Sequence, residues 1–120
     1  MQFDLDTVYC GAIKRGDIFL IHDEKEKAVI VVQDTILNER LPTVLVIPIE
    51  PLKQGEVIFK NEFALTKSET GLGKAGLCRP YQMRALNRHH IYAKRGELSN
   101  ARLRELCAVI DINLGRFRDV

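Results

Sequence analysis

Three short apolar runs near the start of the chain place the strongest constraint on its fold. They cover residues 17–22, 27–33 and 43–49, are rich in β-branched side chains, and are separated by polar or proline-containing segments. Runs of this length and composition predict β-strands. The charged segment 22–26 between the first two predicts a hairpin connection. Pro48 falls within the third run, and because proline cannot donate to a sheet ladder, we expect this strand at an edge or with a bulge.

Shorter strands are expected in the second half of the chain. A strand with an irregularity near Asn61 is predicted over residues 56–65, followed by a glycine-containing loop over residues 67–74. Three further strands are predicted over residues 76–79, 83–87 and 91–94.

One amphipathic helix is expected near the C-terminus. Ser99 is a favoured N-cap residue and Gly115 is typical of a helix end. Leu98 and Leu103 can form a hydrophobic staple across the first turn. An apolar stripe with the helical period of 3.6 residues comprises Leu103, Leu106, Cys107, Ile110 and Leu114. Several short strands with one helix predict a mainly β fold with α, built as a small β-barrel with a C-terminal helix.

Length and composition exclude several classes of protein. With 120 residues, 46% of them hydrophobic and 28% charged, the chain fits one globular domain over residues 1–120. Its apolar runs are too short to span a membrane, and its acidic N-terminus does not resemble a signal peptide, so we expect a cytoplasmic protein that does not bind membranes. Cys10, Cys78 and Cys107 lack the spacing of a zinc site. No metal or cofactor is therefore expected, and Cys78 and Cys107 are interpreted as core residues.

Positive charge is concentrated in one stretch of the second half. Residues 79–95 contain five arginines and lysines and no acid. A one-sided basic segment suits a polyanion such as nucleic acid. The alternative is a solvated basic edge, and composition alone does not decide between the two.

Five short segments follow one another in a fixed order: IKRGDIFLI at 13–21, AVIVVQD at 28–34, LPTVLVIPI at 41–49, GLCRPYQMRALN at 76–87 and GELS at 96–99. Each motif is short, but their order and spacing over about residues 13–115 resemble those of the MazF/PemK family of toxins.

The resemblance implies a fold and an activity. The fold would be an SH3-like small β-barrel of the CcdB/MazF/PemK type, preceded by an N-terminal extension over residues 1–12. The protein would be the toxin of a type II toxin–antitoxin system, acting as a homodimer and silenced by a cognate antitoxin protein. Its activity would be metal-independent cleavage of single-stranded RNA, mRNA in particular, leaving 2′,3′-cyclic phosphate and 5′-OH ends. Such chemistry requires a base for the ribose 2′-OH, cations for the phosphorane and an acid for the leaving oxygen.

Three catalytic positions follow from the resemblance. Lys27 stands where the family has an arginine that serves the phosphate, and it keeps the charge without the bidentate fork. Glu50 stands where the family has threonine or serine, and it is a candidate base. Arg79 matches an arginine that contacts RNA in some PemK-like members, whose aspartate two positions later is Tyr81 here. The ordinary alternatives are a strand-end lysine at Lys27 and a turn acid at Glu50.

Five further residues are expected to contact the substrate. Glu24 supplies an acid in a shortened first loop, and His22 can exchange a proton near neutral pH. Tyr81 can stack on an unpaired base or fill the edge of the barrel. Gln82 and Arg84 match the QxR pattern of the family, although Arg84 can also pair with acids of the chain itself.

A second function remains open from the sequence. On the same fold, a non-catalytic binding protein would act like a CcdB-type gyrase inhibitor, or as a degenerate paralogue that binds RNA or an antitoxin. The altered residues Lys27, Glu50 and Tyr81 favour this alternative, whereas Gln82, Arg84 and the basic segment favour the ribonuclease.

Overall fold

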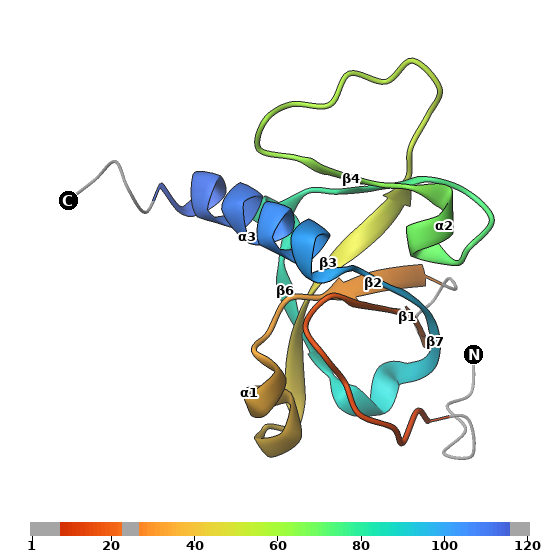
Figure 1. Ribbon diagram of the computed structural model, residues 1–120. Coiled ribbons are helices and arrows are strands. Elements are labelled where there is room, and N and C mark those ends of the chain that lie inside the picture. Colours follow the sequence, from red (N-terminus) through yellow and green to blue (C-terminus); the bar gives the residue numbers. More distant parts are fainter. Residues whose placement is uncertain (1–7, 23–26, 116–120) are drawn as a thin grey trace.

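Over the residues that the structure describes, the chain forms one antiparallel sheet of seven strands with three helices (Figure 1). The structure, a computed structural model, describes residues 8–22 and 27–115. The strands are β1 (Asp17–Ile21), β2 (Lys27–Val31), β3 (Thr43–Pro51), β4 (Phe63–Leu65), β5 (Gly76–Cys78), β6 (Arg84–Asn87) and β7 (Ile91–Glu97). The helices are α1 (Thr35–Arg40), α2 (Lys67–Thr70) and α3 (Asn100–Leu114), with 3-10 turns η2 (Pro80–Gln82) and η3 (Arg88–His90).

The strands follow the order β4-β5-β3-β2-β1-β7, and β6 pairs with β3 beside this path. The mainly β fold with a C-terminal helix is therefore confirmed. Within the described ranges no pairing joins β4 to β7, so the sheet is open rather than a closed barrel.

Strand β3 is the centre of the sheet. It pairs with β2 along one side, where Val29 lies opposite Pro48. Its other side pairs with β6 over Thr43–Val46 and with β5 from Ile49 onward. The prediction that Pro48 marks an edge strand is wrong. Proline is tolerated here because it lies where β3 changes its second partner from β6 to β5.

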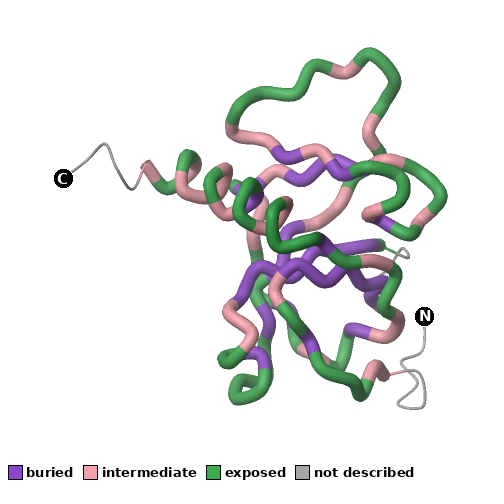
Figure 2. Tube along the Cα trace, viewed as in Figure 1, coloured by how far each residue is buried: buried purple, intermediate pink, exposed green. Residues whose placement is uncertain are grey.

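The core lies on both faces of the sheet, as Figure 2 shows along the strands. Residues of alternating register divide between two clusters, with Phe19 and Val29 in one and Ile18 and Ile30 in the other. The second cluster also includes Leu106 of α3, which is fully buried. Alternation along β1 and β2 thus gives both faces an apolar surface, and α3 covers one of them.

Both predicted ends of α3 are confirmed. The Ser99 side chain accepts a hydrogen bond from the backbone N–H of Arg102 at 3.2 Å, and Gly115 ends the helix with a φ of 63°. The predicted apolar stripe is only partly buried. Leu106 is enclosed, whereas Leu114 is 65% exposed because the last turn extends past the sheet (Figures 1 and 2).

The segment between β3 and β4 differs most from the prediction. Residues 52–62 form a long loop that stands away from the sheet in Figure 1, and only β4 remains of the strand expected over 56–65. Val57 and Phe59 are 69% and 64% exposed. Their alternation looks like that of a strand, but no neighbouring strand pairs with them among the described residues.

The glycine-containing segment 67–74 begins with a short helix instead of a loop. Helix α2 carries a capping box, in which Thr66 and Glu69 exchange hydrogen bonds between side chain and backbone. Gly71 ends it in the left-handed conformation, with a φ of 65°.

None of the described helices combines the length and the hydrophobicity of a membrane span.

Candidate functional site

A cleft of about 640 Å³ lies at the ends of the central strands, between β2, β3, β7 and the loop that follows α2. Apolar residues of the sheet, such as Leu20 and Ile49, form part of its lining. Among the described residues, those of its lining that carry charge are Lys27, Glu50, Lys74 and Arg95. Three cations and one carboxylate therefore meet in one concave surface.

The pairing of β2 with β3 positions the first two of these residues. Ala28 lies opposite Ile49 in the antiparallel register, so the adjoining residues Lys27 and Glu50 lie at the same end of the two strands. Both are exposed. The structure thus brings together the predicted cation and the predicted base.

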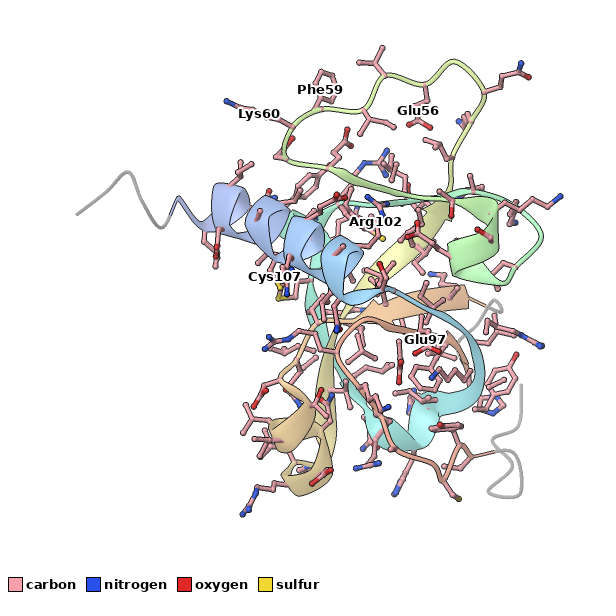
Figure 3. The ribbon with its side chains drawn as sticks, viewed as in Figure 1. Glu56, Phe59, Lys60, Glu97, Arg102 and Cys107 are labelled. Carbon is pink, nitrogen blue, oxygen red and sulfur yellow. The ribbon has the colours of Figure 1, made fainter. Side chains whose placement is uncertain are left out.

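Arg79 approaches Glu50 from the opposite side, directly after β5. Its Nη1 donates to a carboxylate oxygen of Glu50, and its Nε donates to Glu62 Oε2 at 2.9 Å. Its Nη2 lies 3.5 Å from Glu56 Oε2. Hydrogen bonds to Glu50 and then to Glu62 raise the pKa of Arg79 above its usual value. Figure 3 shows Glu56 directed into the space between its loop and the sheet, while Phe59 points outward.

These contacts limit what Arg79 can do. Glu62 keeps only 8% of its side chain exposed. Glu50 is near the end of β3, and Glu56 and Glu62 belong to the loop that joins β3 to β4. Three of the five N–H groups of this guanidinium are directed at carboxylates, and the three negative charges around it oppose the approach of a phosphate. In this arrangement Arg79 can instead hold Glu50 at the rim of the cleft.

Of the other predicted contact residues, the four that the structure describes do not line the cleft. His22 stacks on Tyr92, with ring centroids 4.2 Å apart. Tyr81 is 62% exposed on η2, and Gln82 lies in the same turn. Arg84 lies on β6, opposite Val46. Glu24 falls outside the described residues.

The basic segment 79–95 does not form a single surface. Arg88 donates to the backbone oxygen of Asn38 at 2.8 Å, and Lys94 pairs with the buried Asp17 at 3.3 Å. Of the five cations in this segment, Arg95 alone lines the cleft. Counting charge along the sequence therefore overestimated the basic surface.

Two cleft residues were missed in the sequence. Lys74 follows Gly71 and Gly73 in a segment predicted to be a loop, and Arg95 was predicted as one of the basic segment's cations without a role of its own. Within residues 8–22 and 27–115, neither side chain has an ion-pair partner. The available signal was the positive charge of each beside a glycine, at Gly73 and Gly96.

The thiols take no part in the cleft. Cys78 is buried in the core, as expected, and burial raises its pKa to about 12. Cys107 is only partly buried, and Cys10 is exposed. Among the described residues, no group of three or more His, Cys, Asp and Glu side chains could hold a metal ion.

Comparison with known proteins gave one family and a set of similar folds. A family described as "PemK-like, MazF-like toxin of type II toxin-antitoxin system" matches residues 14–114. No curated protein matches the sequence.

Similar solved structures include an endoribonuclease in complex with its cognate antitoxin from a mycobacterial species. It has a TM-score of 0.74 at 16% identity and covers 87% of this chain and 96% of that one. The Mycobacterium tuberculosis toxin MazF-mt6 has a TM-score of 0.71 at 16% identity, with 82% and 96% covered. A MazE–MazF structure from Deinococcus radiodurans has a TM-score of 0.71 at 17% identity, with 88% and 99% covered. At these identities the likeness concerns the fold.

Proposed function

This chain belongs to the PemK-like, MazF-like toxin family of type II toxin–antitoxin systems, and we propose that it cuts single-stranded RNA, chiefly mRNA, without a metal cofactor. The observation that carries the proposal is the cleft in which Lys27, Lys74 and Arg95 surround Glu50. Three cations can attract the sugar–phosphate backbone, and one exposed carboxylate can accept a proton.

In the proposed reaction the nucleophile comes from the substrate. Glu50 removes the proton of a ribose 2′-OH, whose oxygen attacks the adjacent phosphorus. The bond between phosphorus and the 5′-oxygen breaks, that oxygen takes a proton from solvent water, and Glu50 returns its proton to solvent. The products are a 2′,3′-cyclic phosphate and a 5′-OH end, and no oxidation occurs.

Lys27 and Arg79 take different parts in this scheme. Lys27 lines the cleft, where its ammonium group can stabilise the charge that develops on the phosphorane oxygens. Arg79 acts on Glu50 through their hydrogen bond and is a positioning residue. The family's arginine at the position of Lys27 would bind a phosphate through two parallel bonds, whereas lysine provides a point charge.

The proposal extends to partners and location. A cognate antitoxin would neutralise the protein by covering the basic cleft with an acidic segment. We further propose a homodimer that works in the cytoplasm, where its mRNA substrate lies.

The test is incubation of the purified protein with a long unstructured RNA in EDTA, followed by mapping of the ends. Discrete cuts with cyclic-phosphate and 5′-OH ends are expected, and Lys27→Ala should reduce them. Arg40→Ala is a matched control, because it removes an exposed cation of α1 outside the cleft lining. RNA that remains intact at high protein concentration would contradict the proposal and favour a binding protein that acts on gyrase, RNA or an antitoxin.

A further inference from the structure

Lys74 and Arg95 lie in the cleft wall formed by the loop after α2 and by β7. Lys27 and Glu50 come from β2 and β3 instead. The two cations of the wall are thus separate from the pair to which we assign the chemistry.

Close backbone packing builds this wall. A Cβ atom added at Gly71 would lie 1.7 Å from the backbone oxygen of Arg95, and one at Gly96 would lie 2.0 Å from the backbone oxygen of Glu69. Only glycine allows the two segments to approach so closely. The contact fixes the backbone of Arg95 against the end of α2.

A buried hydroxyl group fixes the other cation. Thr70 is fully buried, and its Oγ1 donates toward the backbone oxygen of Lys74 at 2.7 Å and lies 3.1 Å from that of Lys67. Thr70 Oγ1 also accepts a hydrogen bond from the backbone N–H of Leu72 at 3.2 Å. The loop that carries Lys74 is therefore held to α2 by its own hydrogen bonds.

Two described acids that adjoin this wall, Glu50 in the cleft lining and Glu69 in α2, already have cationic partners. Glu50 accepts a hydrogen bond from Arg79, and Glu69 accepts one from Arg102 Nε at 2.8 Å. Positive charge at Lys74 and Arg95 is thus left facing a concave surface. A ligand for the whole cleft must provide anionic groups for the wall and a hydroxyl group for Glu50. A ribose–phosphate chain offers both at every nucleotide, whereas an acidic peptide offers mainly the first.

We propose that Lys74 and Arg95 form a phosphate-binding subsite for a nucleotide next to the cleaved bond. This inference rests on the proposed ribonuclease function and makes it more specific. The substrate must carry at least one phosphate beyond the one that reacts. A dinucleotide is therefore a poor substrate, and the wall sets the register of the RNA relative to Glu50.

The experiment uses a short RNA whose cleavage site has been mapped and which a single 2′-deoxy nucleotide at that site makes uncleavable. One phosphate at a time is replaced by a neutral methylphosphonate, and binding to the full-length protein is measured by fluorescence anisotropy. Neutralising one flanking phosphate should weaken binding by roughly tenfold, as expected for the loss of a charge-assisted hydrogen bond. In the variant Lys74→Ala/Arg95→Ala the same replacement should have almost no effect.

The control is Arg40→Ala/Lys60→Ala, which removes the same charge from exposed residues outside the cleft lining. This variant should remain as sensitive to the neutral linkage as the wild type. Thermal unfolding of each variant checks that it is folded. The inference would be overturned if no methylphosphonate weakened binding to the wild type. It would also be overturned if one weakened binding to Lys74→Ala/Arg95→Ala as strongly as to the wild type.

The outcomes separate the two proposals. If the wild type cuts the parent RNA but no single methylphosphonate weakens its binding, the subsite is disproved and the ribonuclease function stands. If the wild type cuts no RNA, the methylphosphonate scan is made on an unstructured RNA that it binds. A linkage that is sensitive with the wild type and insensitive with the cleft variant then keeps phosphate binding by Lys74 and Arg95 and removes the ribonuclease. An oligoglutamate peptide serves as the acidic-protein probe. If this peptide, but no RNA, binds the cleft variant more weakly than the wild type, the wall binds a protein and the inference is wrong.

Discussion

The two sides of Glu50 use positive charge in opposite ways. On the cleft side, Lys74 and Arg95 have no ion-pair partner among the described residues and face a concave surface. On the other side, Arg79 is surrounded by Glu50, Glu56 and Glu62. The first side is suited to an external anion, and the second to orienting the carboxylate that the two sides share.

The comparison shows that the charge available to a ligand is what remains after internal pairing. Arg79 was one of several candidates for phosphate contact in the sequence, yet three carboxylates lie around it and oppose the approach of a phosphate. Lys74 matched no motif in the sequence, but it lines the cleft. The partners of each cation, rather than its position in a basic segment, decide its role.

The largest effect is expected at Glu50, which lies between the two sides. Glu50→Gln should lower the cleavage rate by about 10²–10⁴-fold, because an amide cannot accept the proton of the 2′-OH. RNA binding should be unchanged or tighter, since one negative charge is lost from the cleft. Single-turnover kinetics and anisotropy measure the two quantities. A Glu50→Gln protein that cuts at the wild-type rate would remove Glu50 as the base.

A smaller effect is expected on the side of Arg79. Arg79→Met should lower kcat by up to roughly 10²-fold, because misplacing a catalytic group by about 1 Å has effects of this size. KM for RNA should change little if Arg79 does not contact the substrate. Steady-state kinetics separate the two parameters. An increase in KM with an unchanged kcat would show that Arg79 binds RNA directly.

Two glycines with positive φ allow a matched comparison of backbone stability. Gly55 has a φ of 78° and open space around the position of an added Cβ atom. Gly71 has a φ of 65°, and an added Cβ atom would clash with the backbone oxygen of Arg95 in β7. Gly55→Ala should cost about 1–2 kcal/mol of unfolding free energy from the left-handed conformation alone. Gly71→Ala should cost more and should also weaken RNA binding, because the cleft wall must move. Denaturant unfolding compares them, and equal costs would show that the close contact with Arg95 is unimportant.

The smallest effect is expected at Glu69, which forms the capping box of α2 with Thr66. Burial raises the pKa of Glu69, but hydrogen bonds from Arg102 and from the backbone of Thr66 outweigh it and bring the pKa below 4.5. A carboxyl pKa that is lower in the folded than in the unfolded state stabilises the fold at pH values above the unfolded-state pKa. This contribution is lost as the pH falls through the folded-state pKa. Glu69→Gln should therefore lower Tm at neutral pH and flatten its decline below pH 4.5. An unchanged profile would mean that this ion pair contributes nothing measurable.

Local patterns predicted the strands and the caps of α3 because both depend on neighbouring residues. Ser99 and Gly115 could be assigned from their own chemistry. The loop over 52–62 could not, since Val57 and Phe59 alternate like strand residues and only the absence of a pairing partner excludes a strand. The change of partner at Pro48 also depends on where distant strands lie.

The site was predictable in part for the same reason. Lys27 and Glu50 were found through their places in the family pattern, and the pairing of β2 with β3 brings them together. The partners of Arg79 lie 17, 23 and 29 residues away in sequence, so their contact could not be read from spacing. Lys74 and Arg95 meet through backbone packing at Gly71, which sequence motifs do not reveal.

The most direct test of this account is the salt dependence of RNA binding. An uncleavable RNA is titrated at several salt concentrations with the wild type, with Lys74→Ala/Arg95→Ala, and with Arg79→Met/Glu56→Gln, which leaves the net charge unchanged. The slope of log affinity against log salt should fall by about one for each lost phosphate contact in the cleft variant, and should stay at the wild-type value in the Arg79 variant. A slope that falls in the Arg79 variant and not in the cleft variant would place the RNA on the other side of Glu50 and contradict the account.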